Sequence, residues 1–214
     1  MPLGSTEQHG PHLPLGTDAA VAEAVARDLA ARSIRAGVDA AAAPVLGYGA
    51  SGEHEAFAGT VSIGTSALTT VLVEIGRSAG RWAPSLVFVN GHGGNLDAVL
   101  SAVRILRDES RDVAWLACAA PSQGAVAADA HAGRTETSLM LHLAPALVRA
   151  GRAAAGQTRP LREILPELQR SGVAGVSANG VLGDPAGASA EEGARLLAAM
   201  SDRAWGRLPA GDPV

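Results

Sequence analysis

Apolar side chains recur three or four positions apart in five stretches of the chain, as a helix with one buried face requires. The stretches lie around Val21/Val25/Leu29, around Leu68/Leu72/Ile75, at 96–106, around Leu139/Leu143/Leu147 and at 189–205. Two short uninterrupted apolar runs, at 86–89 and from Val113 onward, are typical of buried strands. The pattern therefore predicts a protein that mixes helices with strands.

The middle of the chain gives the clearest organisation. The strand expected at 86–89 is followed by a glycine-rich loop, by the helix at 96–106 and by the strand from Val113. A strand, a helix and a second strand in succession imply a parallel sheet, so we predict an α/β fold in a single domain of residues 1–214. Weaker segments at 42–46 and 173–176 are expected to add strands, 151–160 to form a surface excursion, and 208–214 to fray.

Composition and charge exclude several classes of protein. Of the 214 residues 47% are hydrophobic and 18% charged, which excludes a disordered chain. None of the basic residues is lysine, which removes P-loop and Schiff-base lysine chemistry. The net charge of -4 without a basic block argues against nucleic acid as a partner, and no apolar stretch approaches a membrane span of about 18 residues. We therefore expect a cytoplasmic protein, with the single Cys118 as a small core residue.

Five of the six histidines lie in loop-like sequence beside Gly, Glu or Asp, a composition that favours a catalytic metal site. A domain of this length can bury roughly 70–75% of its surface, so a metal would serve chemistry and not folding. Glu7 and His9 are two positions apart, so both point to the same side of an extended segment. Asp18 is either a ligand or the N-cap of the helix that follows.

Two further clusters follow along the chain. His92 lies in Asn90-Gly-His-Gly-Gly-Asn95, at the carboxyl end of a parallel strand, where α/β sheets bind ligands. His131 and Glu136 lie where a loop joins a helix, so Glu136 can also act as a favourable charge in a first helical turn. His142 is expected to be structural. The residues that we predict to line a substrate pocket are His12, Glu53, His54 and Asn95.

Three motifs of other enzyme classes are incomplete or absent. The glycines of Gly47-Tyr-Gly-Ala-Ser-Gly52 match a dinucleotide fingerprint, but no apolar helix follows them. His54-Glu55 lacks the second histidine of a zinc protease, because Ala58 occupies that position. The chain also contains no G-x-S-x-G elbow of a serine hydrolase.

Four blocks of this sequence resemble the signature blocks of the creatininase family, in the same order. They are Gly4-Ser-Thr-Glu-Gln-His-Gly-Pro-His-Leu-Pro14, Phe57-Ala-Gly-Thr60, Asn90-Gly-His-Gly-Gly-Asn95 and His131-Ala-Gly-Arg-Thr-Glu-Thr-Ser138. The resemblance implies a three-layer αβα amidohydrolase with two divalent ions (Zn, Fe(II) or Mn) that activate water for attack on an amide. It implies that the metal ligands are Glu7, His9, Asp18 and His92, with Asp18 bridging both ions, and that His131 is the catalytic acid or base.

The sequence departs from creatininase itself at several positions. Creatininase has Tyr and Glu where this chain has Gly93 and Gly94, and Trp where Ala127 stands. These differences argue against creatinine as the substrate, and Glu136 becomes the candidate for the missing fifth ligand. The family also has a full strand before the first block, where this chain has only Met1-Pro-Leu3. Either the start of the chain is truncated, or the sheet lacks part of an edge.

Other stretches resemble one group within the family, the mycofactocin-system peptidases. These stretches include Tyr48-Gly-Ala-Ser-Gly-Glu-His54, Ser62-Ile-Gly-Thr65 and Gly180-Val-Leu-Gly-Asp-Pro185. The resemblance implies cleavage of a modified precursor peptide near its C-terminus, which releases a modified Val-Tyr dipeptide, and it implies a homo-oligomer. The alternatives are an amidohydrolase of cyclic amides or formamides, and a metal-binding assembly module without catalysis.

Overall fold

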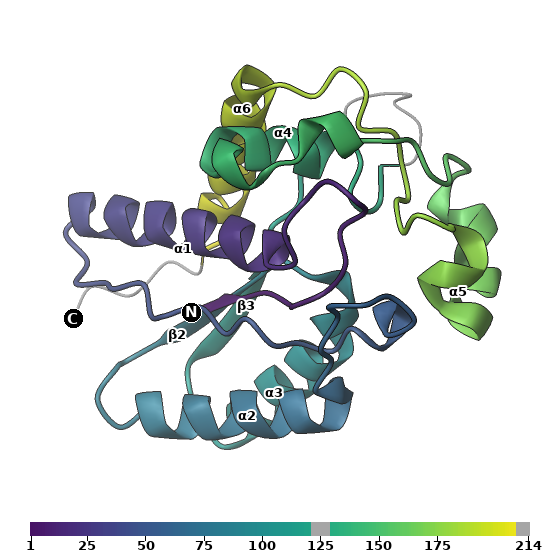
Figure 1. The fold of residues 1–214 in the computed structure, drawn as a ribbon. Helices are drawn as coiled ribbons and strands as arrows, with labels where there is room; N and C mark the ends of the chain where they lie inside the picture. The colour runs from purple at the N-terminus through teal and green to yellow at the C-terminus, as the bar shows by residue number, and fades with distance from the viewer. Residues whose placement is uncertain (121–128, 209–214) are drawn as a thin grey trace.

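The computed structural model describes residues 1–120 and 129–208, and its elements form three layers (Figure 1). The middle layer is a parallel sheet of three strands in the order β1-β2-β3. The strands are β1 (Pro2–Leu3), β2 (Leu86–Asn90) and β3 (Val113–Ala117). The predicted α/β class and the predicted parallel strand–helix–strand unit are thereby confirmed.

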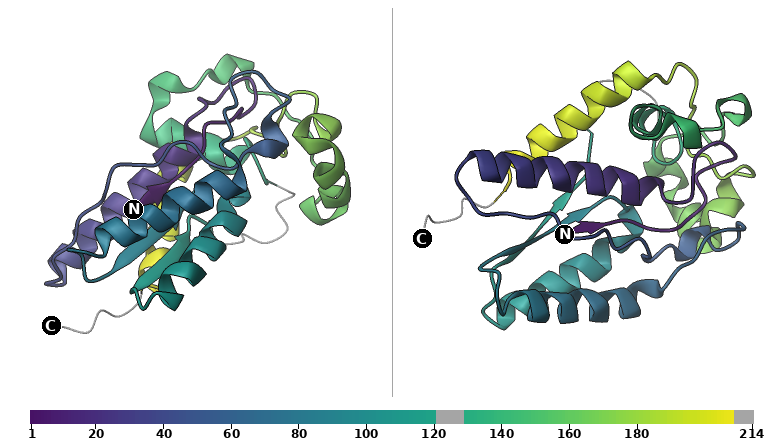
Figure 2. Two further views of the ribbon diagram at one scale, coloured as in Figure 1. Left: turned by 90° about the horizontal axis from the view of Figure 1, so that it is seen from below. Right: turned by 60° about the vertical axis from the view of Figure 1, so that its left-hand side comes forward.

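Helices cover both faces of the sheet. The helices are α1 (Thr17–Arg35), α2 (Gly64–Ala79), α3 (Leu96–Asp108), α4 (Arg134–Leu143), α5 (Leu161–Val176) and α6 (Ala190–Trp205). In Figures 1 and 2, α2 and α3 lie on one face of the sheet, while α1, α4 and α6 lie on the other. No helix within the two described segments is long and apolar enough to cross a bilayer.

Alternating side chains of β2 supply the two main cores. Phe88 packs against α2 and α3, whereas the adjacent Val89 packs against α1, α4 and α6. This division follows from the pleat of a strand, in which successive side chains point to opposite faces. Leu106 of α3 is fully buried in the first core, and the half-buried Cys118 packs against the second. The cysteine is therefore a packing residue, as the sequence indicated.

A third apolar group lies outside both cores, and we call it the outer cluster. It consists of Ile164 and Val173 of α5 together with Leu182, with Phe57 packed against them. Figure 1 shows α5 standing to one side of the three layers. The outer cluster thus ties α5 to the chain around Phe57 and to the segment that carries Leu182.

Three expectations about secondary structure were wrong. The segment 173–176 is the last turn of α5, beyond a kink at Gly172, and Val173 and Val176 pack in or against the outer cluster. The segment 42–46 forms no strand beyond a single parallel bridge from Leu46 to Leu3. The helix expected to reach Leu147 ends at Leu143, because the proline at position 145 cannot continue it.

Strand β1 is the shortest strand of the described sheet. Strand β1 has two residues, paired in register Pro2 to Val89 and Leu3 to Asn90. All three strands run in the same direction, so the segments that follow Leu3, Asn90 and Ala117 leave the sheet at one end. The site lies at this end.

Candidate metal centre

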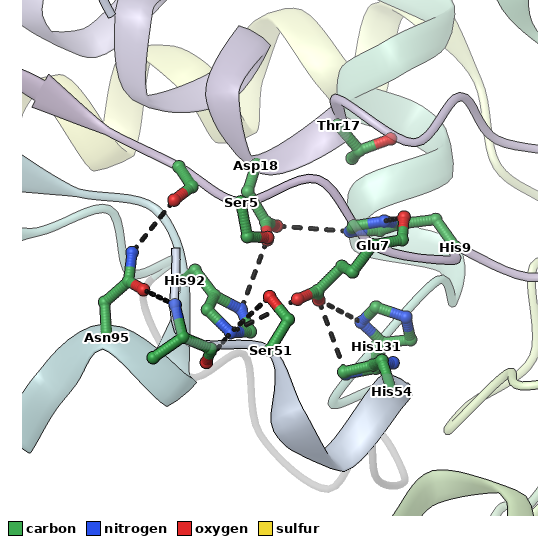
Figure 3. A network of polar contacts seen from close by, with 12 residues as sticks. Ser5, Glu7, His9, Thr17, Asp18, Ser51, His54, His92, Asn95 and His131 are labelled. Carbon is green, nitrogen blue, oxygen red and sulfur yellow. Dashed lines mark hydrogen bonds and ion pairs between the residues drawn. The ribbon is translucent and has the colours of Figure 1, made fainter. Parts of the chain in front are cut away.

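Side chains from four loops converge beyond the carboxyl end of the sheet. Figure 3 shows Glu7 at the middle of this cluster, with His92 on one side and His54 and His131 on the other. His9 and Asp18 lie next to Glu7, and all six side chains are buried. The structure thus brings together residues that are as much as 124 positions apart in the sequence.

The segment after β1 contributes Glu7 and His9. Its path is fixed by hydrogen bonds from Glu7 N to Leu15 O at 3.1 Å and from Val61 N to Thr6 O at 2.8 Å. His9 Nδ1 lies 3.1 Å from the carbonyl oxygen of Glu7, so a proton on Nδ1 is held there. Its Nε2 is left facing the cluster, the arrangement that a metal-binding imidazole commonly has.

Asp18 lies in the first turn of α1 but does not cap it. Gly16 is the N-cap residue, and no side chain forms a capping bond there. The carboxylate instead points into the cluster, where Ser5 Oγ donates to Oδ2 at 2.5 Å. Oδ1 lies 3.2 Å from His9 Nε2, and Oδ2 lies 3.2 Å from His92 Nδ1. The two oxygens therefore face two different histidines.

His92 is held by the turn that ends β2. Asn90 Nδ2 donates to the His92 carbonyl at 2.7 Å, and Asn95 Nδ2 donates to Asn90 Oδ1 at 3.2 Å and to Gly4 O at 2.9 Å. Asn95 Oδ1 accepts from Ala50 N at 2.9 Å. The buried Asn95 amide, predicted as a pocket residue, is thus placed behind His92, where it ties three loops together.

The loop before α4 contributes His131 and Glu136. His131 Nδ1 lies 3.7 Å from Glu7 Oε1, so this side chain reaches the centre of the cluster. Glu136 occupies the first turn of α4, where its Oε2 accepts from Ala132 N at 2.6 Å and lies 3.9 Å from His9 Nε2. Glu136 therefore places a carboxylate at the N-terminal end of α4 and also lies next to the proposed ligand His9.

The predicted pocket residues lie at different depths. His54 is inside the cluster, with Nε2 3.4 Å from Glu7 Oε1. Glu53 is partly exposed, and its Oε1 lies 3.5 Å from His92 Nε2. A Cβ at Gly94 would lie 2.7 Å from that same Glu53 oxygen, so the Glu53 carboxylate borders the space that a larger residue 94 would occupy.

His12 and His142 lie outside the group of side chains around Glu7. His12 is buried and pairs through Nε2 with Thr137 Oγ1 at 2.9 Å. His142 is exposed on α4. Ala127, where creatininase has tryptophan, lies outside the described residues.

Sequence reasoning missed the polar neighbours that orient the ligands. Ser5 contacts Asp18, and Ser51 Oγ lies 3.5 Å from His92 Nε2. Gln8 contacts both His54 and His131. The available signal was the position of Ser5 and Gln8 within the first signature block, next to predicted ligands, since serine and glutamine by themselves indicate no particular chemistry.

Mutual charge and burial set the protonation of the inner side chains. Burial, reinforced by the Asp18 carboxylate, raises the pKa of Glu7 to about 7. Burial by itself would lower the pKa of His9 and His92, but their bonds to Asp18 outweigh it and raise these pKa values to about 10 and about 9. Although burial opposes it, the two histidines hold the pKa of Asp18 well below its ordinary value. A carboxylate thus lies between two cationic rings whose protons divalent ions can replace.

The pKa values of His54 and His131 are shifted in the opposite direction, below their ordinary values. Burial, together with the neighbouring charges of His92 and His9, lowers the pKa of His54 to about 3. Burial also brings the pKa of His131 well below its ordinary value. Both rings are therefore neutral near pH 7.

The donor set fits divalent metal ions. Both carboxylate oxygens of Glu7 are buried, and neither has a hydrogen-bond partner among residues 1–120 and 129–208. A buried carboxylate is costly without a partner, and a metal ion would supply one in addition to His92 Nε2, which lies 3.2 Å from Oε2. Three sets of donor atoms lie within 4.8 Å of one another: Glu7/His9/Asp18, Glu7/His54/His131 and His9/His131/Glu136. Mixed imidazole and carboxylate donors suit Zn, Mn or Fe.

The chain is similar to known proteins along almost all of its length. The family model of creatininase (creatinine amidohydrolase) matches residues 1–207. The mycofactocin precursor peptide peptidase of Mycobacterium tuberculosis (strain CDC 1551 / Oshkosh) is 56% identical over 94% of this chain and 80% of that protein. The protein of the same name from Mycolicibacterium smegmatis is 51% identical over 100% of this chain and 85% of that protein.

A solved structure shares the fold. The putative creatinine amidohydrolase from Bacteroides fragilis superposes with a TM-score of 0.82 at 26% identity, over 96% of this chain and 85% of that one. Structures of creatininase described as a Zn-Zn type and as a Mn form also match. These matches confirm the three-layer fold and the family that the signature blocks indicated. The chain belongs to the creatininase family.

Proposed function

We propose that this chain is a metal-dependent peptidase that hydrolyses the modified mycofactocin precursor peptide near its C-terminus and releases the modified Val-Tyr dipeptide. The observation that carries the proposal is the identity of 51–56% with peptidases of that name, over 94–100% of this chain. The buried cluster around Glu7 supports it, because it supplies the ligands and proton carriers that amide hydrolysis needs.

The ligands that we propose are Glu7, His9, Asp18, His92 and Glu136. Asp18 lies between His9 and His92 and offers one oxygen to each, which supports a bridging role. Two divalent ions bound here would lower the pKa of a water molecule and polarise the amide carbonyl. The ions are Zn, Fe(II) or Mn, in keeping with the Zn-Zn and Mn forms of creatininase.

His131 is proposed to carry the proton. Its Nε2 lies 2.7 Å from the carbonyl oxygen of Gln8 and donates its proton there, which leaves an unprotonated Nδ1 facing Glu7. The neutral ring can accept a proton from the attacking water at Nδ1 and pass it from the same atom to the leaving amine. General acid–base catalysis of this kind contributes typically about 10²- to 10⁴-fold.

The test is to incubate the metal-loaded protein with modified precursor peptide and to detect the dipeptide by mass spectrometry. His92→Ala is expected to abolish release and to lose metal while the protein stays folded, because His92 belongs to neither main core. The matched control is His142→Ala, which changes an exposed histidine of α4. A His92→Ala variant that keeps full activity after chelator treatment would contradict the proposed chemistry.

A second arm of the experiment supplies creatinine. The creatinine amidohydrolase of Pseudomonas putida is 33% identical over 69% of this chain, which makes creatinine and related cyclic amides the competing substrates. We expect no turnover of creatinine. Turnover of creatinine without peptide cleavage would replace the proposed substrate, and a metal-free, inactive protein would favour an assembly module.

Two further proposals concern assembly and location. We propose a homo-oligomer, which multi-angle light scattering of the purified protein would test. A cytoplasmic location stays a prediction of the sequence, to be checked by cell fractionation.

A further inference from the structure

Gln8 lies between two proposed ligands but points its side chain toward other partners. Its Oε1 accepts from Gly10 N at 2.8 Å, and its Nε2 donates to Gly180 O at 3.1 Å. Of the two ends of the Gln8 amide, only the oxygen can accept from an N–H group and only the NH2 group can donate to a carbonyl, so the two contacts fix which end is which. Nε2 also lies 3.3 Å from His131 Nε2, but that nitrogen donates its own proton to the Gln8 carbonyl oxygen at 2.7 Å, so the second hydrogen of Gln8 Nε2 is directed at His54 Nδ1, 2.8 Å away.

This contact fixes the proton on His54. Because Nδ1 accepts a hydrogen bond, the neutral ring carries its proton on Nε2. That Nε2 faces the centre of the cluster, 3.4 Å from Glu7 Oε1 and 4.0 Å from Glu53 Oε1. His54 therefore offers the site an N–H donor and no lone pair.

The backbone of Gln8 does the reverse for His131. The Gln8 carbonyl oxygen accepts from His131 Nε2 at 2.7 Å, so this ring also carries its proton on Nε2 but turns Nδ1 toward Glu7. The two ring centroids are 4.4 Å apart, and Figure 3 shows both rings beside Glu7. Gln8 thus contacts two adjacent rings that both carry their proton on Nε2. His54 directs this N–H group at Glu7, whereas His131 directs its unprotonated Nδ1 there.

We propose that Gln8 is a positioning residue that makes His54 the hydrogen-bond donor to the oxygen of the scissile carbonyl and leaves His131 as the acceptor of the water proton. The proposal rests on the amide hydrolysis proposed above. As water adds to the carbonyl carbon, negative charge develops on its oxygen, and an N–H already directed at the site stabilises that charge. No proton leaves His54 in this step, since a hydrogen bond suffices.

The backbone around Gln8 fits closely against its side-chain amide. Gly10 and Gly180 have φ values of +64° and +78°, which side chains rarely adopt. A Cβ on Gly180 would fall 2.7 Å from Gln8 Nε2. The backbone therefore closes around the amide from two sides, and Gln8 is buried with every polar atom of its side chain in use.

The first test determines which ring nitrogens of His54 and His131 carry a proton. Long-range ¹H–¹⁵N correlation spectra of the zinc-loaded protein at pH 7 are expected to show His54 and His131 protonated on Nε2 alone. In Gln8→Met, His54 is expected to lose this single state, because Nδ1 has lost its donor. His131 is expected to keep its state, because its partner is a backbone oxygen, so it serves as an internal control. A wild-type His54 protonated on Nδ1, or on both nitrogens, would overturn the proposal.

The second test measures kcat and KM. Gln8→Met and His54→Asn are each expected to lower kcat about 10²- to 10³-fold, the usual cost of one oxyanion donor. KM and the zinc content are expected to stay unchanged, because neither residue is a proposed ligand. The control is Gln169→Met, which removes an exposed amide of α5. An unchanged kcat in Gln8→Met, or a loss of zinc that accounts for the lower rate, would overturn the positioning role.

The two tests separate this proposal from the proposed function. If the wild-type protein cleaves no precursor peptide but shows the expected spectra, the peptidase function fails and the assignment of the two rings stands. If the protein cleaves peptide but the spectra differ, the peptidase function stands and the role of Gln8 fails.

Discussion

Replacing Asp18 by asparagine tests the centre of the proposed metal site with almost no change in shape. Asp18 accepts from Ser5 Oγ at 2.5 Å and lies 3.2 Å from both His9 Nε2 and His92 Nδ1. Asparagine keeps one acceptor oxygen but turns an NH2 group toward one of these partners. The negative charge between the two rings is lost as well.

The size of the effect follows from these contacts. A hydrogen bond to a charged group contributes about 1.5–3 kcal/mol. Loss of one such bond in Asp18→Asn is expected to lower the free energy of unfolding of the chelator-treated protein by about 2–3 kcal/mol. At about 2–4 °C per kcal/mol for a chain of this size, Tm falls by about 4–12 °C.

The assay combines differential scanning calorimetry with a metal count by mass spectrometry. Asp18→Asn is expected to bind less than one ion per chain, because the bridging carboxylate is gone. The matched control is Asp97→Asn, an exposed aspartate in the first turn of α3, which removes the same charge from an equivalent helical position. Equal Tm and equal metal content in the two variants would refute the reasoning.

Two further outcomes are expected. In the chelator-treated protein the pKa values of His92 and His9, about 9 and about 10, lie above their unfolded values, so the stability that their contacts with Asp18 contribute is lost as pH rises through those values. Tm of the metal-free protein should therefore fall between about pH 7 and 10, and a flat scanning-fluorimetry profile would contradict the assigned contacts. Leu106→Ala should cost about 2–5 kcal/mol in urea unfolding, because Leu106 is fully buried, whereas the exposed Leu100→Ala on the same helix should cost far less; equal costs would contradict the packing.

The regular part of the fold could be predicted because its signals are local. The apolar spacing of α1, α2, α3 and α6 reflects a single buried face, which a short window of sequence shows. The segment 173–176 could not be assigned in this way, because a run of four residues fits a strand or a helix equally well. What decided it was packing of Val173 against Ile164 and Leu182, contacts made within the folded chain.

The same distinction applies to the site. Glu7, His9 and His92 were candidate ligands because their chemistry is unusual in loops, whereas Asp18 was chosen over a helix-cap role only through the family resemblance. The role of Gln8 was not, because it depends on His54 and Gly180, which lie 46 and 172 positions away. Its partners are visible only once the chain has folded.

The outer cluster has a consequence for motion. His131 and Leu182 exchange backbone hydrogen bonds of 3.2 and 2.8 Å, and a Cβ at Gly172 of α5 would lie 2.8 Å from the Glu53 carbonyl oxygen. The segments with His54 and His131 are therefore supported by the outer cluster, whereas Asp18 and His92 are supported by the sheet and its cores. A protein can open such units separately, with free energies well below that of global unfolding. Amide hydrogen exchange should then be faster in α5 and around Leu182 than in β2, so that one wall of the site can open to admit a peptide while the other stays in place.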